Sequence, residues 1–364
     1  MNDTQTDNSH IDDEASRRVA GRWIEDAWYY AMASTALRPG AMAHRTILGQ
    51  AMLLGRDRGG RVFALRDTCP HRGTLLSRGM FDGREVECPY HGWRFDTAGR
   101  CTAIPSQTAS QRPQPADIAV SRFTVDERQG NIWIYPRSGE TPRMPVPEVP
   151  RLGAKPQMHM SMVFDCDIDL ATIGLMDPAH GAFVHRSILW RTKASIHQKT
   201  KAFSPVSGGG FIGWRMDRHT ASTNSRAYRL LLGGAPETEI TYLMPSVRIE
   251  HATTGRYSYC GLTACTPIDS KRTHVHHTMY WDVPFVGLLK PLIRRIAYNF
   301  LDQDRRAVEA MRDGQAFSPP TMLVRDADTQ ARWYFKLKHE LLEAAAAERT
   351  PRNPIQPTTL TWRS

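Results

Sequence analysis

Two short loops with Cys and His at fixed spacing constrain this chain more than any other feature of its sequence. The first loop reads CPHRG at residues 69–73, and the second reads CPYHGW at residues 88–93. Sixteen residues separate the CxH pair of the first loop from the CxxH pair of the second. Thiolates and imidazoles at such spacings are typical metal ligands, so the fold must bring the two loops to a common point. The candidate ligands are Cys69, His71, Cys88 and His91.

The ligand types alone leave two kinds of metal site open. Two thiolates and two imidazoles suit a structural zinc ion, which takes four such ligands in a tetrahedron. They equally suit a Rieske [2Fe–2S] cluster, in which two Cys hold one iron and two His hold the other. The two loops closely resemble Rieske loops, because a glycine follows each histidine-containing tip. We therefore expect the cluster rather than zinc.

The sequence around the two loops predicts antiparallel β-hairpins. The apolar runs AMLLG and RVFALRD are joined by the Gly-containing turn RDRGG, and the second run leads into Cys69. The segments GWRFDTAGRCTAIP and FTVDERQGNIWIYP repeat this arrangement further along the chain. The two loops are therefore expected at the tips of neighbouring hairpins, where a rigid scaffold can direct ligands at one point.

Proline content marks a boundary between two domains. Residues 136–156 contain six prolines, which is typical of an extended linker. A chain of 364 residues is long enough for two domains of ordinary size. The predicted organisation is a disordered acidic tail over residues 1–20, a domain that carries the two loops over residues 21–150, and a second domain over residues 151–364.

The second domain is predicted to belong to the α+β class. Residues 210–283 contain runs typical of antiparallel strands, namely GFIGWRM, RAYRLLLGG, SVRIEHA, YSYCGLTACTPI and RTHVHHTMYWDV. A helix is expected after them, from about residue 286 to 312. Strands followed by helices favour a sheet that wraps a long helix.

A second group of metal-ligand residues lies in the segment MDPAHGAFVH. Asp177, His180 and His185 form a DxxHxxxxH pattern there. On a regular helix the two histidines point about 140° apart, so both reach one metal only if the helix widens or unwinds between them. Pro178 and Gly181 favour such an interruption. Taken alone, the pattern also fits two unrelated histidines on a helix.

The helix FLDQDRRAVEAM offers a carboxylate that would complete this second site. Asp304 shares the apolar face of the predicted helix, whereas Asp302 and Glu309 lie near Arg305 and Arg306 on the polar face. A carboxylate on an apolar face requires a compensating charge or hydrogen bonds. Two His and one carboxylate form the facial triad of non-haem Fe(II) oxygenases, which leaves positions open for O2. Asp304 is therefore the third candidate ligand, and a buried Asp bonded to backbone amides is the alternative.

Composition excludes several other classes of protein. The chain is 41% hydrophobic and 23% charged, and no apolar run approaches the roughly 18 residues of a membrane span. Its net charge of +10 comes from scattered basic residues without a nucleic-acid-binding pattern, so an acidic protein is the specific partner that it favours. Six cysteines are too few for a disulfide scaffold. With an acidic start that is not a targeting segment, these features predict a cytoplasmic protein without nucleic-acid or membrane partners.

The order of these motifs resembles the catalytic α subunit of the Rieske non-haem iron oxygenases over residues 22–340. The short form and the HxxxxH spacing are most similar to the single-subunit monooxygenases and O- or N-demethylases. The resemblance implies an N-terminal antiparallel β Rieske domain and a C-terminal helix-grip catalytic domain, with an antiparallel sheet around a long helix. It also implies a [2Fe–2S] cluster on Cys69, His71, Cys88 and His91, and Fe(II) on His180, His185 and Asp304.

The same resemblance gives Asp177 a role between the two metal centres. It implies that Asp177 accepts a hydrogen bond from His180 and contacts the cluster ligand His71 of a neighbouring chain. The implied assembly is a head-to-tail C3 homotrimer. One position departs from the family pattern, because Gly174 stands where many short relatives have Asn.

The activity implied by the resemblance is O2 activation at Fe(II), with electrons supplied by the cluster, to hydroxylate or oxidatively demethylate an aromatic or other cyclic organic substrate. The sequence contains no flavin or nicotinamide fingerprint, so NAD(P)H would act only through a separate flavin reductase, with or without a ferredoxin. cis-Dihydroxylation of an aromatic ring is the enzyme alternative. A plain Rieske electron carrier is the alternative without enzyme activity.

The sequence does not specify the substrate contacts. Trp190 and Trp214 are candidate walls of a substrate site, although a Trp in such a strand is more often part of the core. The segment THVHHTMYW places His274 and His276 on one face of a strand and His277 on the other. Because a charged turn lies close by, we expect these three histidines on the surface rather than in a further metal site.

Overall fold

The chain divides into two units, each with its own sheets. The computed structural model describes residues 19–108, 110–150, 155–185, 196–220, 229, 231–284, 286–319 and 322–364. The N-terminal unit consists of Glu25–Glu148 and Thr266–Ser270, and the C-terminal unit consists of the residues up to Ile24, Val149–Cys265 and Lys271–Ser364. Residues 1–18 of the expected tail lie outside the described residues, whereas Val19 is buried. No helix among the described residues is long and apolar enough to cross a membrane.

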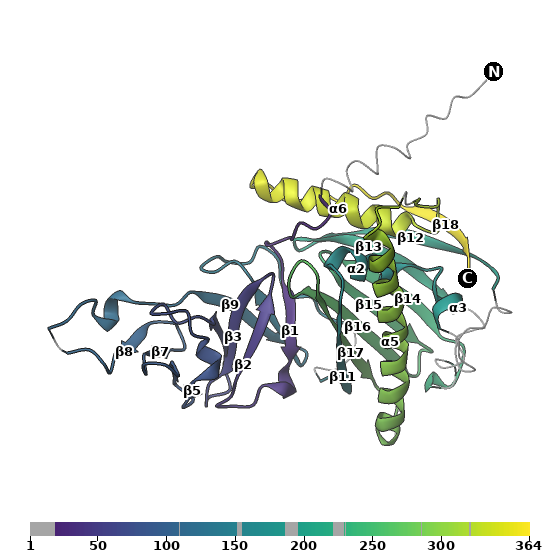
Figure 1. Cartoon of the computed structure of the whole chain (residues 1–364). Helices are drawn as coiled ribbons and strands as arrows, with labels where there is room; N and C mark the ends of the chain where they lie inside the picture. The colour runs from purple at the N-terminus through teal and green to yellow at the C-terminus, as the bar shows by residue number, and fades with distance from the viewer. Residues whose placement is uncertain are drawn as a thin grey trace. The chain divides into compact units, whose positions relative to one another are not determined.

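The N-terminal unit contains two antiparallel sheets (Figure 1). The six-stranded sheet has the order β1-β10-β9-β4-β3-β2, and the four-stranded sheet has the order β5-β6-β7-β8. The strands are β1 Tyr29–Ala33, β2 Met42–Ile47, β3 Gln50–Arg56, β4 Val62–Arg66, β5 Met80–Phe81, β6 Glu85–Glu87, β7 Arg94–Asp96, β8 Cys101–Ala103, β9 Arg122–Arg128 and β10 Asn131–Tyr135. The three predicted hairpins are confirmed, because β3 pairs with β4, β7 with β8 and β9 with β10.

An apolar core lies behind the two Cys/His loops and anchors them. Cys69 and Cys88 are almost fully buried in this core, together with Leu76, Val86 and Phe95. The loops therefore start from fixed points, and their freedom is confined to the few residues at each tip.

The C-terminal unit is built on an eight-stranded antiparallel sheet in the order β11-β17-β16-β15-β14-β13-β12-β18. Its strands are β11 Met158–Phe164, β12 Gln198–Gly208, β13 Phe211–Thr220, β14 Glu237–Leu243, β15 Val247–Thr253, β16 Ser258–Pro267, β17 Thr273–Trp281 and β18 Thr358–Arg363. Its helices are α2 Ile168–Met176, α3 Gly181–Val184, α5 Lys290–Gln315 and α6 Thr329–Ala346. The predicted α+β class is therefore confirmed.

The long helices lie against this sheet (Figure 1). Helix α5 packs on β11 and α2, and α2 also packs on α6. Trp333 of α6 contacts Phe203 of β12 and Trp214 of β13, with ring centroids 5.5 and 5.8 Å apart. The α2–α6 contact contains a buried ion pair, in which the Lys338 ammonium donates to Asp169 at 2.5 Å. The sheet thus holds the long helices as the predicted helix-grip arrangement requires.

Parts of the sheet differ from the prediction. The strands β12, β14 and β18 were not predicted, and β18 joins β12 from the far end of the chain. The predicted strand over residues 226–234 is wrong, because its described residues include a helical turn in which the Gly233 amide donates to the Arg229 carbonyl at 3.0 Å. Trp214 belongs to the core, where its indole N–H donates to Gln330 on α6 at 2.9 Å.

Helices α2 and α5 pack closely at Gly174. A Cβ at this position would lie 2.5 Å from Cγ2 of Val308 on α5, a distance that packed carbon atoms do not reach. An Asn at this position therefore cannot be accommodated unless the Val308 side chain or α5 moves. The glycine allows a tighter helix pair one turn away from Asp304.

We expect Gly174→Asn to lower the melting temperature of the protein, because the new side chain would collide with Val308. Overpacking of this kind costs about 1–3 kcal/mol. Val308→Ala removes the colliding methyl group, so the double variant should recover part of the loss. Thermal unfolding of both single variants and the double variant measures the coupling between the two positions.

Gly314→Asn on α5 is the matched control, since no atom lies within 4 Å of a Cβ at that position. If the control loses as much stability as Gly174→Asn, or if the effects at Gly174 and Val308 are additive, contact with Val308 is not what excludes the side chain.

Candidate metal centres

Three side chains from two separate segments converge in the C-terminal unit. The Nε2 atoms of His180 and His185 lie 3.2 Å apart, and Oδ1 of Asp304 lies 3.4 Å from the first and 3.1 Å from the second. His185 and Asp304 are buried, at 2% and 6% exposure. These three residues form a group that could hold one metal ion.

The chain around His180 and His185 is interrupted as the sequence predicts. Helix α2 ends at Met176, Asp177 has non-helical backbone angles, and the short helix α3 begins only at Gly181. His180 and His185 flank α3 at its two ends. This break removes the 140° divergence of a regular helix and lets both Nε2 atoms face Asp304.

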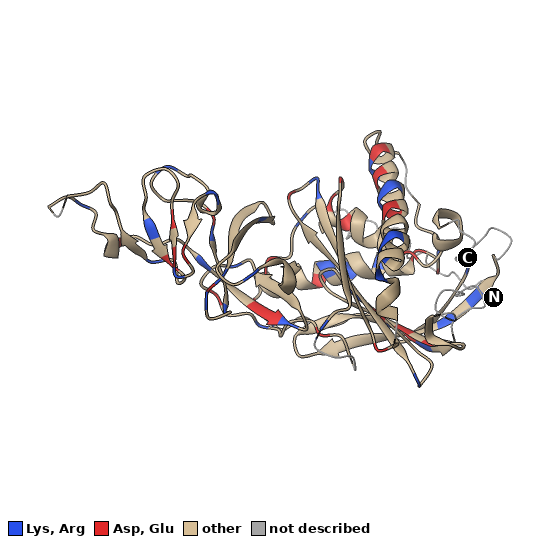
Figure 2. Cartoon of the chain, turned by 90° about the horizontal axis from the view of Figure 1, so that it is seen from below, with Lys and Arg blue, Asp and Glu red and all other residues tan. Residues whose placement is uncertain are grey.

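Asp304 lies on the buried face of α5, between Leu301 and Val308. Acidic and basic residues alternate along the rest of this helix (Figure 2). Asp302 and Glu309 both pair with Arg305, at 2.7 and 2.6 Å. The periodicity of the sequence thus separates the buried acid from the two acids paired with arginine.

Each histidine is oriented by a hydrogen bond at its outer nitrogen. Nδ1 of His180 donates to the main-chain carbonyl of Asp177 at 2.8 Å. The Asp177 carboxylate lies 3.8 Å from the same nitrogen and accepts instead from the amide of Ala179 at 2.7 Å. The expected hydrogen bond from His180 to Asp177 therefore forms through the main chain. Because Nδ1 carries the proton, the Nε2 lone pair points toward His185 and Asp304.

Two residues that sequence reasoning missed hold His185. Oε1 of Gln303 accepts a hydrogen bond from Nδ1 of His185 at 3.1 Å. The Phe300 ring stacks on the imidazole, with centroids 3.5 Å apart and planes 15° apart. Phe300 lies on the apolar face that identified Asp304, so its position was predictable, whereas no spacing rule pointed to Gln303.

The electrostatics of this group favour a bound cation. Burial alone would lower the pKa of His180, but the Asp304 carboxylate can accept a hydrogen bond from the protonated ring and attracts its charge, and this raises the pKa above its ordinary value. Burial opposes ionisation of Asp304, yet His180 and His185 hold the pKa of Asp304 below its ordinary value. Burial raises the pKa of Asp177. Two imidazoles and one carboxylate aimed at one point suit Fe(II), with the remaining positions open.

In the N-terminal unit, a glycine closes each of the two Cys/His loops. The Gly73 amide donates to the Cys69 carbonyl at 2.8 Å, and the Gly92 amide donates to the Cys88 carbonyl at 3.1 Å. Gly73 and Gly92 have φ angles of +73° and +68°, a conformation that residues with a Cβ rarely adopt. The two loops therefore have the same closed shape.

The four candidate ligands of these loops gather at one place. The imidazoles of His71 and His91 have centroids 4.5 Å apart. The thiols of Cys69 and Cys88 are hydrogen-bonded neighbours, and burial first and then Cys88 raise the pKa of Cys69 to about 11. The Trp93 indole stacks on His71 at 4.9 Å, and its buried N–H has no hydrogen-bond partner among the described residues.

This arrangement suits a two-iron cluster better than zinc. Among the described residues, His180, His185 and Asp304 have ligand atoms within 4.8 Å of one another, whereas the four residues of the loops do not form such a group. The two Cys and two His of the loops are more widely spread than a single tetrahedral ion requires. A cluster with two irons and bridging sulfides would fill that larger space.

A buried carboxylate that sequence reasoning missed braces the first loop. Asp67 is fully buried two residues before Cys69. It accepts hydrogen bonds from the amide and hydroxyl of Ser77 at 2.6 and 2.5 Å, and it lies 2.6 Å from Nδ1 of His44. These bonds fix the end of β4, from which the loop starts.

The expectation of surface histidines in β17 is wrong for His276, whereas His274 and His277 are half-buried. His276 is buried at 2% exposure. His277 bonds to Thr263 through Nδ1 at 2.8 Å and contacts the Tyr259 hydroxyl through Nε2 at 3.4 Å. Strand alternation gave the two faces correctly, but both faces of β17 are covered. Trp190, the other candidate wall, lies outside the described residues.

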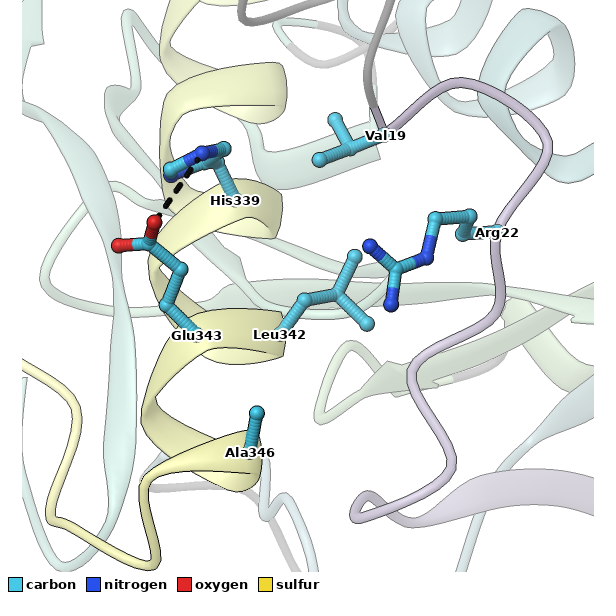
Figure 3. Close-up of a pocket in the computed structure, with 6 residues that line it drawn as sticks. All are labelled: Val19, Arg22, His339, Leu342, Glu343 and Ala346. Carbon is cyan, nitrogen blue, oxygen red and sulfur yellow. Dashed lines mark ion pairs between the residues drawn. The ribbon is translucent and has the colours of Figure 1, made fainter.

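A separate surface pocket lies between the N-terminal segment and α6 (Figure 3). Val19 and Arg22 face His339, Leu342 and Glu343 across it, and His339 pairs with Glu343 at 3.4 Å. None of the candidate metal ligands lines this pocket.

Two family patterns match the chain in the order of its two units. Residues 27–123 match the Rieske [2Fe-2S] domain, and residues 164–344 match the vanillate O-demethylase oxygenase C-terminal domain. The combination defines the class of protein: the chain belongs to the Rieske oxygenases.

Curated relatives fall in the same class. The chain is 34% identical to the oxygenase component of dicamba O-demethylase from Stenotrophomonas maltophilia, over 45% of this chain and 48% of the relative. It is 32% identical to the 4beta-methylsterol monooxygenase of Methylococcus capsulatus, over 39% of this chain and 42% of the relative. The chain thus spans about half the length of these curated relatives.

Solved structures share the fold over a larger part of the chain. Dicamba monooxygenase bound to dicamba superimposes with a TM-score of 0.71 at 26% identity, over 89% of this chain and 99% of that one. The QL mutant of NdmA from Pseudomonas putida CBB5, with caffeine, has a TM-score of 0.72 at 20% identity, over 94% of this chain and 97% of that one.

Gln303→Leu should weaken Fe(II) binding, because it removes the acceptor that fixes the His185 ring. Loss of such an outer partner typically reduces metal affinity about 10–100-fold. Gln303→Glu keeps an acceptor at this position and should retain most of the affinity. Competition with a chelator measures the Fe(II) affinity of each variant.

The matched control is Gln330→Leu, which removes a buried amide that accepts a hydrogen bond from Trp214. It should lower thermal stability and leave the Fe(II) affinity unchanged. Equal loss of affinity in both Leu variants would mean that general destabilisation, rather than the orientation of His185, reduces binding.

Proposed function

We propose that this chain is the terminal oxygenase component of a multi-component system. It activates O2 at a mononuclear non-haem Fe(II) fed by a Rieske [2Fe–2S] cluster, and it hydroxylates or oxidatively demethylates an aromatic or other cyclic organic substrate. One observation carries the proposal: the Nε2 atoms of His180 and His185 and a carboxylate oxygen of Asp304 converge within 3.4 Å.

The proposed ligands are those that the sequence predicted. His180, His185 and Asp304 bind Fe(II), and Cys69, His71, Cys88 and His91 bind the cluster. When bound, Fe(II) with three protein ligands supplies open positions for O2 and substrate oxidation, and the cluster supplies electrons one at a time.

The contribution of the chain is to hold these ligands in their binding forms. The Asp177 carbonyl and the Gln303 amide keep the protons of His180 and His185 on Nδ1, so both Nε2 atoms are available. Phe300 restricts rotation of the His185 ring by stacking on it. Burial of Asp304 removes competing water from its carboxylate, which strengthens its attraction to a cation.

The named relatives favour hydroxylation or demethylation over cis-dihydroxylation. One relative is named as an O-demethylase and the other as a monooxygenase, and neither is named as a dioxygenase. Hydroxylation of a methyl group on O or N gives a product that releases formaldehyde. Formaldehyde release would therefore separate demethylation from formation of a diol.

Electron supply and assembly follow from the same proposal. A ferredoxin, a flavin reductase or both would reduce the cluster, with NAD(P)H used only by the separate reductase. A head-to-tail homotrimer would place the cluster of one chain near the iron of the next, with Asp177 between them. The Asp177 side chain is one-third exposed and so is available to a neighbouring His71. Six cysteines without disulfides suit the reducing cytoplasm.

The purified protein should contain about three irons and about two acid-labile sulfides per chain, with a Rieske EPR signal after reduction by dithionite. Asp304→Ala should lower the iron content to about two and leave the sulfide and the EPR signal unchanged. Asp302→Ala on the same helix is the matched control, because Asp302 pairs with arginines on the polar side.

Each other result has a distinct meaning. Three irons in the Asp304→Ala variant would mean that a carboxylate other than Asp304 is the third ligand. Zinc in place of iron, with no sulfide, would refute the proposed function. If a His180→Ala variant kept every activity of the wild-type protein, the iron site would not be needed and the protein would be an electron carrier.

The donor protein should be acidic, because the chain has a net charge of +10. The rate of cluster reduction by an acidic ferredoxin, followed by stopped-flow absorbance, should then fall several-fold as salt increases. Reduced methyl viologen is the control, since a small cation should show a weaker or opposite dependence. A ferredoxin rate that does not change with ionic strength would exclude steering by charge.

A further inference from the structure

The last strand of the eight-stranded sheet reaches the turn that carries His180. Strand β18 pairs with β12 over all six of its residues. Trp362 lies near the end of β18 and is 7% exposed. Its indole N–H donates to the main-chain carbonyl of Pro178 at 3.2 Å, so residues 184 positions apart in the sequence meet beside a candidate iron ligand.

This contact holds one side of a peptide group whose other side is already bonded. The carbonyl of the Pro178–Ala179 peptide accepts from Trp362, and its N–H donates to the Asp177 carboxylate at 2.7 Å. Because a peptide group is planar, the two bonds together fix the orientation of its plane. His180 follows Ala179 directly, so this plane sets the direction in which the chain enters His180.

Two further hydrogen bonds are internal to the turn. Nδ1 of His180 donates to the Asp177 carbonyl at 2.8 Å, and the Ala179 amide donates to the Asp177 carboxylate. Bonds of this kind keep the shape of the turn, but they leave it free to shift as a whole relative to Asp304. The bond from Trp362 ties the turn to the sheet, and the packing of α5 on β11 ties Asp304 to the same sheet. Both ligand segments are thus anchored to one sheet.

Trp362 is held in place by its own neighbours. It lies opposite Lys199 of β12, whose ammonium donates to the Ser364 hydroxyl at 2.7 Å. The Ser364 hydroxyl oxygen lies 3.2 Å from the Trp362 indole nitrogen, and the Phe203 ring contacts the Trp362 ring with centroids 6.4 Å apart. An indole has a single N–H, which Ser364 alone would satisfy. Burial of the indole therefore does not require its approach to Pro178.

We infer that Trp362 is a positioning residue of the iron site. Its hydrogen bond to Pro178 holds the turn of residues 177–180 so that Nε2 of His180 faces the other two ligands. Trp362 acts through the main chain of the turn rather than through a ligand atom. The inference rests on the proposed function, because it concerns the same iron site.

Trp362→Phe tests this role, because it removes the N–H and keeps an aromatic ring in the strand. The variant should bind Fe(II) about three- to tenfold more weakly, as expected from the loss of one hydrogen bond. Competition with a chelator measures this affinity in the full chain with its cluster present. The EPR spectrum of the nitric oxide adduct of the bound Fe(II) should broaden as well, since His180 would adopt a wider range of orientations.

A second substitution at position 362 separates the hydrogen bond from the packing of the ring. Benzothienylalanine has the bicyclic shape of Trp but carries sulfur in place of the N–H. It should weaken Fe(II) binding as much as Trp362→Phe does, and it leaves the space around the ring filled. An unchanged Fe(II) affinity in this variant would show that the hydrogen bond does not hold the turn.

Trp214→Phe is the matched control. It removes another buried indole N–H of the same sheet, which bonds to Gln330 on α6. It should lower the melting temperature and leave the Fe(II) affinity and the nitric oxide spectrum unchanged. Ser364→Ala removes the second acceptor of the Trp362 indole and should also retain the Fe(II) affinity, since the bond to Pro178 remains.

Three results would overturn the inference. The first is an unchanged Fe(II) affinity in Trp362→Phe. The second is an equal loss of affinity in Trp214→Phe, which would assign the effect to general destabilisation. The third is an equal loss in Ser364→Ala, which would mean that Trp362 acts by holding the end of its strand rather than Pro178.

The wild-type protein distinguishes this inference from the proposed function. A wild-type protein that contains the cluster and binds Fe(II), with the same affinity in every variant, refutes only the role of Trp362. A wild-type protein without iron and sulfide refutes the proposed function.

Discussion

The close approach of α2 to α5 at Gly174 determines where the candidate iron ligands can meet. His180 and His185 follow α2, and Asp304 lies on α5 one turn before Val308, the residue that Gly174 contacts. Separations of 3.1–3.4 Å among the three ligand atoms depend on the distance between these helices. A side chain at position 174 would collide with Val308. Gly174, which replaces the Asn of the family pattern, therefore lets α2 and α5 pack together next to the site.

The two metal centres obtain their geometry in different ways. The loops of the N-terminal unit carry their ligands on short closed turns, set by Gly73 and Gly92 and anchored by buried Cys69 and Cys88. Local sequence fixes almost all of this shape. The C-terminal centre joins elements more than 100 residues apart, so helix packing and the outer hydrogen bonds of its histidines must define it. This difference explains why the first centre was easier to predict.

Local patterns predicted most of the fold and the candidate ligands that the structure brings together. Periodicity separated Asp304 from the acids on the polar face of α5, and Pro178 with Gly181 indicated the break after α2. The wrong or missing predictions concern contacts between residues far apart in the sequence, which no local pattern contains. Alternation gave the two faces of β17 but not what covers them, so the buried His276 was expected on the surface. Strand β18 depends on a pairing with the distant β12, and Gln303 on a contact with a ring 118 residues away.

Burial disfavours the charged forms of His277 and Asp304 in the C-terminal unit. It lowers the pKa of His277, and it opposes ionisation of Asp304. Charges persist there where a partner compensates them, as in the ion pairs Arg248–Glu250 and Lys338–Asp169. Asp304 differs from these, because its partners are two imidazoles that are neutral unless they bind a proton. A metal cation supplies that missing charge without a proton, so the charge compensation that stabilises the fold elsewhere provides a metal-binding site here.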